Sequence, residues 1–331
     1  MTEMTEEKPP KIIEFDQASV RIGRVNILRD ISFYTREREI LGVIGASGSG
    51  KTTCLRVMTA QLKPYRGIAR IAGYNVKKDA AAIHYATGYV PQHEDESLYF
   101  PFSALENAHF FGRMYAITGR EIQRRASEIL DILGFDEDLM HKPVKFLSGG
   151  ERKRVSICVG LIHQPPLLLL DEPTTGLDAH LRHELLNYLK QLNYHFGTSM
   201  VLISHDLEVV EYCNRVVLLE KGTISLQGHP DELIRSLTGK GEAIEVTFDR
   251  LTEETIRQVS DIPFVKTTIR SGRGSLKVFV DEPHVQLPNL LKALRELNQL
   301  PTELSVVEAS FYDFFRTKSW REPEETAEAI A

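Results

Sequence analysis

The order of apolar and polar positions divides the chain into a longer first part and a smaller second part. In the first part, short apolar runs predict buried strands at residues 40–44, 167–170 and 199–203, and helical spacing predicts helices at 54–62 and 179–196. Strands that alternate with helices in this way predict an α/β fold, a largely parallel sheet with helices on both faces. Because such sheets bind ligands at the carboxyl ends of their strands, we expect the functional residues there.

Two further segments belong to the first part. Residues 11–33 alternate between apolar and polar positions and predict strands at a sheet edge. Residues 103–133 repeat apolar positions at helical spacing, interrupted at Gly119 and closed by Gly134, and predict an all-helical insertion.

The second part begins where the composition changes, at a linker predicted by Gly239, Lys240 and Gly241. We expect domains at 11–238 and 243–318, with a loose tail at 1–10 and an acidic tail at 319–331. The second domain has a predicted β-α-β-β-α-β order, which is typical of a small ferredoxin-like α+β unit. Its elements are expected at 244–248, 252–259, 265–270, 276–280, 287–297 and 304–308, before an aromatic stretch at 311–315 that we interpret as packing.

Composition limits the functional classes. The chain has 331 residues, a net charge of −6 and 42% hydrophobic residues, as an ordinary soluble protein does. Because it has neither a run of ~18 apolar residues nor a long basic stripe, it predicts no membrane span and no nucleic-acid partner. The polar, acidic start differs from a signal peptide and predicts a cytosolic protein, in which Cys54, Cys158 and Cys213 stay reduced.

A glycine-rich loop follows the first buried strand. It matches the phosphate-loop pattern G-x-x-x-x-G-K-[S/T] and opens a predicted helix. Its backbone amides are suited to cradle phosphates, Lys51 to neutralise the β and γ phosphates, and the Thr52 hydroxyl to bind Mg²⁺. A turn that only connects strand and helix is the alternative. The loop residues are Gly45, Ala46, Ser47, Gly48, Ser49, Gly50, Lys51, Thr52 and Thr53.

Four more polar positions lie where a nucleotide hydrolase needs them. Asp171 and Glu172 end the Leu-rich strand; the first is suited to hold Mg²⁺ through water and the second to orient or deprotonate the attacking water, although a capping pair is the alternative. His205 ends the next strand and can hydrogen-bond the γ-phosphate, whereas alone it would more often be structural. Gln92 can sense the metal and water. A second helix start suited to anions is predicted at 148–150.

Taken together, these residues resemble the ATP-binding subunit of ABC transporters over residues 11–237. The resemblance implies a P-loop ABC ATPase with a parallel-sheet core, an antiparallel β edge subdomain and a helical subdomain, using ATP and Mg²⁺. It implies catalytic roles for Glu172, His205, Gln92 and the D-loop Asp178, and metal contacts for Thr52, Gln92 and Asp171. The matched motifs also include the L-S-G-G-E signature at 147–151, the Walker B segment at 167–172 and the D-loop at 175–178.

The family arrangement has two subunits closing head to tail over two ATP molecules. By this resemblance, Ser148, Gly149 and Gly150 bind the γ-phosphate held by the partner, and a homodimer has two competent sites. One position departs from the family: the residue expected to stack on adenine is Ile22, which is not aromatic. Loss of stacking worth about 1–3 kcal/mol predicts weaker selection of ATP over GTP.

The segments at 151–156 and 105–115 resemble daunorubicin-resistance-type exporter subunits, which also carry a small C-terminal domain. The basic run 152–154 equally fits a solvated helix face. The rivals are a methionine-type importer ATPase, which has a regulatory ferredoxin-like domain, and a soluble ABC ATPase that remodels ribosomes or DNA. The exporter resemblance implies integral-membrane permease partners in a separate chain and a peripheral location on the inner face of the cell membrane.

Overall fold

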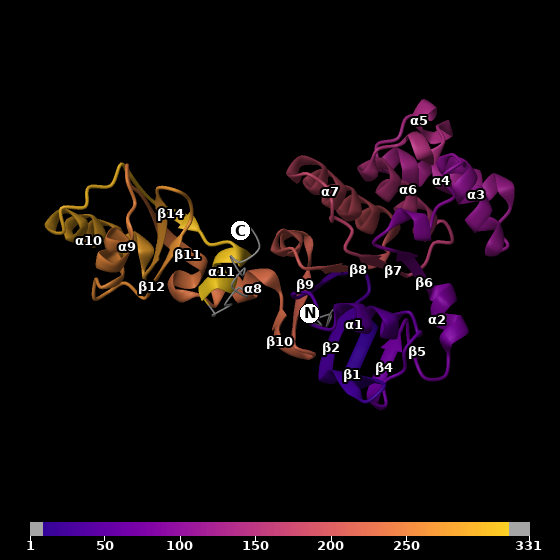
Figure 1. Cartoon of the computed structure of the whole chain (residues 1–331), viewed down its shortest axis with the longest axis horizontal. Coiled ribbons are helices and arrows are strands. Elements are labelled where there is room, and N and C mark those ends of the chain that lie inside the picture. Colours follow the sequence, from indigo (N-terminus) through magenta and orange to yellow (C-terminus); the bar gives the residue numbers. More distant parts are fainter. Residues whose placement is uncertain (1–8, 318–331) are drawn as a thin grey trace, which may run out of the picture. The chain divides into compact units, whose positions relative to one another are not determined.

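The computed structural model describes residues 9–317, which form two compact units that divide between Gly228 and His229 (Figure 1). The short helix α8 (Pro230–Arg235) therefore belongs to the second unit, whereas the sequence placed it in the first domain. The predicted tail at 319–331 and all but two residues of the tail at 1–10 lie outside the described residues.

The first unit is built on a six-stranded sheet in the order β10-β9-β3-β8-β7-β6. The five strands from β9 to β6 are parallel to their neighbours, and β10 pairs antiparallel with β9. This is the predicted, largely parallel sheet. The strands are β3 (Ile40–Ile44), β6 (Thr87–Val90), β7 (Leu167–Asp171), β8 (Ser199–Ser204), β9 (Arg215–Glu220) and β10 (Thr223–Gly228).

An antiparallel sheet in the order β2-β1-β4-β5 accompanies it. Apolar side chains from this sheet, from helix α1 (Lys51–Met58) and from one face of the larger sheet form a single core, in which the rings of Phe15 and Phe33 stack. The core fixes the phosphate loop between the two sheets. The antiparallel strands are β1 (Lys11–Ile22), β2 (Val25–Arg36), β4 (Arg66–Ile71) and β5 (Tyr74–Asn75).

Helices cover the other face of the six-stranded sheet, where they share a second core with β6, β7 and β8. The predicted insertion is helical, and it is interrupted before Gly119, as expected, because Thr118 caps a new helix that begins there. Helix α2 (Ala80–Ala86) was not predicted. The remaining helices are α3 (Ala104–Met114), α4 (Gly119–Ile132), α5 (Glu137–His141), α6 (Gly149–Leu161) and α7 (Ala179–Phe196), with 3₁₀ turns at Glu94–Glu96, Val144–Phe146 and Leu207–Tyr212.

The second unit has the predicted β-α-β-β-α-β order, with its antiparallel sheet in the order β12-β13-β11-β14. Helices α9 and α10 share an apolar core with one face of the sheet. The aromatic stretch forms helix α11, whose phenylalanines are buried. Beyond a 3₁₀ turn at Thr238–Gly241, the elements are β11 (Glu242–Thr247), α9 (Glu253–Ser260), β12 (Thr267–Arg270), β13 (Ser275–Phe279), α10 (Pro283–Glu296), β14 (Glu303–Glu308) and α11 (Phe311–Thr317).

Within residues 9–317, every helix is too short or too polar to cross a membrane.

Candidate active site

The loop 45–53 leaves β3 and ends in the first turn of α1, as the sequence predicts. Its glycines lie where a side chain has no room: a Cβ on Gly45 would lie 2.4 Å from the Leu219 carbonyl oxygen, and one on Gly50 would lie 2.7 Å from the Leu28 side chain. Gly50 also has a φ of 111°, which favours glycine. The loop therefore keeps a bare backbone, as close approach to a phosphate requires.

Lys51 folds back over this loop. Its ammonium donates hydrogen bonds to the carbonyl oxygens of Gly45, at 2.7 Å, and Ala46, at 3.2 Å, and lies 3.8 Å from a carboxylate oxygen of Glu172. Burial lowers the pKa of Lys51, and the charges of Glu172 and Asp171 oppose that shift. The cation is thus held at the loop by two loop carbonyls and by the Glu172 carboxylate, which follows β7.

Asp171 and Glu172 stand at the carboxyl end of β7 in different surroundings. Burial, followed by the charge of Glu172, raises the pKa of Asp171. Glu172 has a φ of 46°, and its amide donates to the Ile203 carbonyl oxygen at 2.8 Å. A non-glycine residue in this region costs on the order of 1–3 kcal/mol, and such strain clusters at functional sites. The Glu172 side chain reaches the carboxyl end of β8, where it contacts Ser204 and His205.

His205 meets Glu172 at the end of β8. Its Nδ1 lies 2.8 Å from Oε2 of Glu172, and because a carboxylate only accepts, this nitrogen carries the proton. The hydroxyls of Ser204 and Thr175 each lie 3.4 Å from the same oxygen. Glu172 therefore bridges Lys51 of the loop and His205, and these three predicted site residues come together.

Gln92 follows β6, the strand beside β7, so the loop, His205, Asp171 and Gln92 lie along one edge of the sheet in the order β3, β8, β7, β6. The side chain of Gln92 is exposed. The backbone carbonyl oxygen of Gln92 accepts a hydrogen bond from the Lys153 ammonium at 2.8 Å, a contact that the sequence did not suggest. Lys153 is only 2% exposed, so this member of the basic run does not lie on a solvated face.

The second predicted anion site begins helix α6. The Ser148 hydroxyl accepts from the Glu151 amide at 3.2 Å, and Glu151 accepts from the Ser148 amide at 2.6 Å, so the two residues form a capping box. Gly149 is exposed, and a Cβ built on it has open space around it. This helix start is accessible to a ligand from outside the chain.

Two predicted site residues have local roles in the structure. Asp178 caps helix α7 by accepting from the Leu181 amide at 2.9 Å. Ile22 is 44% exposed at the end of β1, and the guanidinium of its neighbour Arg21 lies 4.6 Å from the ring centre of Tyr65. The contacts of these residues lie outside the group formed by Lys51, Glu172 and His205.

Two buried serines contribute to the surroundings of the loop: Ser49, which is one of the predicted loop residues, and Ser204, which the sequence did not indicate. Among the described residues, the Ser49 hydroxyl is one of few buried polar atoms without a hydrogen-bond partner, and it lies inside the phosphate loop. Ser204, fully buried, contacts Glu172. Ser204 has no sequence signal apart from its place beside His205.

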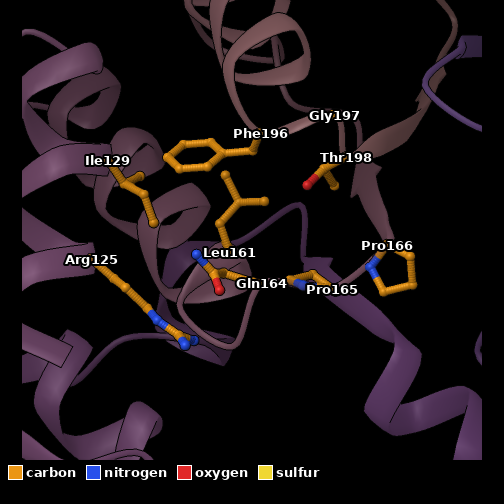
Figure 2. Close-up of a pocket in the computed structure, with 9 residues that line it drawn as sticks. All are labelled: Arg125, Ile129, Leu161, Gln164, Pro165, Pro166, Phe196, Gly197 and Thr198. Atoms are coloured by element: carbon orange, nitrogen blue, oxygen red, sulfur yellow. The ribbon is translucent and has the colours of Figure 1, made fainter. Parts of the chain in front are cut away.

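A cavity of about 410 Å³ lies elsewhere in the first unit (Figure 2). Its lining includes Pro166 and Thr198, which directly precede β7 and β8, so it lies at the amino ends of strands whose carboxyl ends carry the site. Arg125 in its wall pairs with Glu121 at 2.7 Å. The cavity is therefore separate from the phosphate loop.

Comparisons with known proteins agree with this geometry. Residues 28–175 match the family model described as ABC transporter. The chain is 32% identical over 273 residues to a Nod factor export ATP-binding protein I of Cupriavidus pinatubonensis, covering 82% of this chain and 81% of the relative. It is also 32% identical over 288 residues to the daunorubicin resistance ATP-binding protein DrrA3 of Streptomyces coeruleorubidus, covering 86% and 88%.

A solved structure of similar fold is the ATP-binding cassette MJ0796, described as a dimeric post-hydrolysis state bound to ADP and Pi. It aligns with a TM-score of 0.58 and 27% identity, covering 66% of this chain and 98% of that one. The aligned fold is that of a P-loop ATPase cassette.

Proposed function

Because the chain belongs to the ATP-binding subunits of ABC transporters and is an ATPase of that family, we propose that two copies close over two ATP molecules and drive an exporter. The observation that carries the proposal is the meeting of Lys51, Glu172 and His205 beside the phosphate loop. Cations, carboxylates and bare backbone amides at one sheet edge are what nucleotide hydrolysis requires.

The loop fits the phosphates of ATP. A Cβ at Gly45 or Gly50 would collide with neighbouring protein atoms, so glycine preserves the shape of the loop, and the buried Ser49 hydroxyl has no partner among the described residues. Lys51 neutralises phosphate charge. Thr52, exposed at the start of α1, and Asp171 offer the oxygen ligands that Mg²⁺ prefers, with Gln92 completing the set. The bound metal would supply charge neutralisation at the transferred phosphate.

Glu172 acts as the general base. Its carboxylate is held at two points, by Lys51 on one side and His205 on the other, which fixes its orientation toward the loop. His205 positions Glu172 through Nδ1–H, and in its imidazolium form the second ring nitrogen also donates a hydrogen bond to the γ-phosphate. An anchored carboxylate beside a phosphate site can orient and deprotonate water.

A second copy completes each site. The helix start at Ser148, Gly149 and Gly150 points a positive dipole end at an anion, and its exposed first glycine leaves that end open. We assign these residues to the γ-phosphate of the partner, and Asp178 to the interface. The dimeric cassette MJ0796, bound to ADP and Pi, supports this arrangement.

The direction of transport is proposed from the relatives. One of them is named for Nod factor export, and its alignment of 273 residues exceeds the 228 residues of the first unit and so extends into the second. We propose permease subunits in a separate chain as partners, a homodimer of this chain, and a location on the cytoplasmic face of the membrane.

A methionine-type importer is the second candidate, favoured by the split β-α-β order of the second unit. Identifying the polytopic protein that co-purifies with this chain separates the two. An exporter-type permease supports the proposal, whereas a permease with a soluble binding protein supports the importer.

Substitution of Glu172 by Gln tests the catalytic assignment. We expect ATP to be bound and the dimer trapped, while hydrolysis falls by about a thousandfold because the general base is lost. Glu208→Gln is the matched control, since Glu208 pairs with Arg182 at the surface and should leave hydrolysis unchanged. Hydrolysis at the normal rate by the Glu172→Gln variant would contradict the assignment.

A further inference from the structure

Lys153 is a buried cation with three acceptors. Its ammonium donates to the carbonyl oxygens of Pro91, at 3.1 Å, and Gln92, at 2.8 Å, and pairs with Glu94 at 2.6 Å. Its side chain is 3% exposed and that of Glu94 is 23% exposed. Three donors on one ammonium thus meet three acceptors from one short segment, which is the full hydrogen-bonding capacity of lysine.

The two carbonyl contacts hold both peptide groups around Gln92. The Pro91 carbonyl belongs to the peptide before the Gln92 Cα, and the Gln92 carbonyl belongs to the peptide after it. Fixing both peptide planes fixes the backbone dihedrals from which the exposed Gln92 side chain projects. Lys153 therefore determines where that side chain can reach.

The donor belongs to helix α6, which begins at the signature segment. Lys153 lies in its second turn, about 7.5 Å along the axis from Ser148. One turn later, the hydroxyl of Ser156 lies 2.7 Å from that of Ser97, downstream of Gln92. Beneath them the helix packs closely on β6, because a Cβ on Gly88 would lie 2.1 Å from the Gly160 carbonyl oxygen.

We propose that Lys153 is a positioning residue that holds Gln92 in register with helix α6, so that a displacement of Ser148–Gly150 is carried to Gln92 of the same subunit. The inference rests on the proposed function, in which Gln92 serves the subunit's own nucleotide and the start of α6 serves the nucleotide of the partner. Lys153 then links the two nucleotide sites through one helix.

A double-mutant cycle tests this proposal on the full chain. Lys153→Met keeps an unbranched, four-atom apolar stem and removes the ammonium. We expect it to lower kcat for ATP hydrolysis about tenfold while the KM for ATP changes little, because misplacing Gln92 affects the reaction and the loop still holds ATP. In a Gln92→Ala background, Lys153→Met should lower kcat no further.

Arg154→Met is the matched control. Arg154 is the next cation of α6, but its guanidinium donates to the Leu133 carbonyl oxygen at 2.8 Å, away from Gln92. Any reduction of kcat caused by Arg154→Met should multiply with the reduction caused by Gln92→Ala. If Lys153→Met does not fold, Glu94→Gln, at a partly exposed position, should lower kcat about threefold with the same dependence on Gln92.

Equal reductions of kcat by Lys153→Met with and without Gln92 would overturn the positioning role, while hydrolysis by the unaltered chain would leave the proposed function intact. Absence of ATP hydrolysis by the unaltered chain would instead overturn the proposed function, and the positioning role with it.

Discussion

Gly149→Ala separates what this residue does for its own chain from what it does for a second copy. Gly149 is the first residue of α6, its φ lies outside the left-handed region, and a Cβ built on it meets no heavy atom within 4 Å. Alanine therefore fits without strain. Because alanine restricts the unfolded chain, we expect the free energy of unfolding to rise by about 0.4–1 kcal/mol.

Activity should move in the opposite direction. If the bare backbone at Gly149 contacts the γ-phosphate of the partner, the new methyl group occupies space that only the second copy uses. A displacement of about 1 Å can cost on the order of a hundredfold in rate. We expect hydrolysis to fall by that order while ATP binding by the monomer is unchanged, and in a Glu172→Gln background we expect less ATP-dependent dimer by light scattering.

Gly45→Ala is the control, in which both the stability of the single chain and its binding of ATP should fall. Its Cβ would lie 2.4 Å from the Leu219 carbonyl oxygen and 2.5 Å from the Ser49 hydroxyl, so the loop must shift within one chain. Urea unfolding should show a loss of about 1–3 kcal/mol, together with loss of ATP binding. A Gly149→Ala variant that hydrolyses ATP at the normal rate would refute the shared site.

Three further outcomes follow from the structure. Lys51→Met should weaken ATP binding by about tenfold or more in a fluorescent-nucleotide titration, since charge-assisted contacts are lost. Burial lowers the pKa of His163 to about 4, so the stability that depends on the neutral ring is fully present above pH 6.5 and is lost as the pH falls toward 4. Because the ring is partly exposed, we expect this loss to be about 1–2 kcal/mol. His163→Phe should abolish this dependence of stability on pH, as measured by urea unfolding at pH 7 and 5. Lys277→Met leaves Asp313, 3% exposed, without its cation and should destabilise the second unit by about 3 kcal/mol in calorimetry while ATP hydrolysis is unchanged.

The positions of the phosphate loop, Asp171 and His205 along the sheet edge were predictable because each follows a short, largely apolar run. Runs of this kind form the buried parallel strands β3, β7 and β8, and parallel strands bring their carboxyl ends to one edge. The end of α1 was not predictable from the same pattern. Ala60, with a φ of 56°, follows the helix, which ends at Met58, whereas the sequence predicted a helix to residue 62.

Contacts between distant segments were beyond the sequence pattern. The hydrogen bond between Glu172 and His205 depends on the positive φ of Glu172, and no glycine at that position indicates such a turn in the sequence. The capping box at Ser148 and Glu151 has the local sequence signature of a helix start, but that signature gives no information on the ligand. Helix α2 has only Ile83 and Ala86 buried, too few apolar positions for a period to be recognised.

The basic run 152–154 shows why helix α6 can transmit a displacement. Consecutive helical residues point about 100° apart, so three of them sample most of the circumference. Arg152 lies over the Phe100 ring, Lys153 holds the Gln92 segment, and Arg154 donates to Leu133 and lies over Phe135. All of the residues from Val155 to Leu161 are buried as well, which a solvated helix face would not allow. A helix enclosed on every side cannot turn or slide without moving its neighbours, so a force applied at its first turn reaches the segment of Gln92.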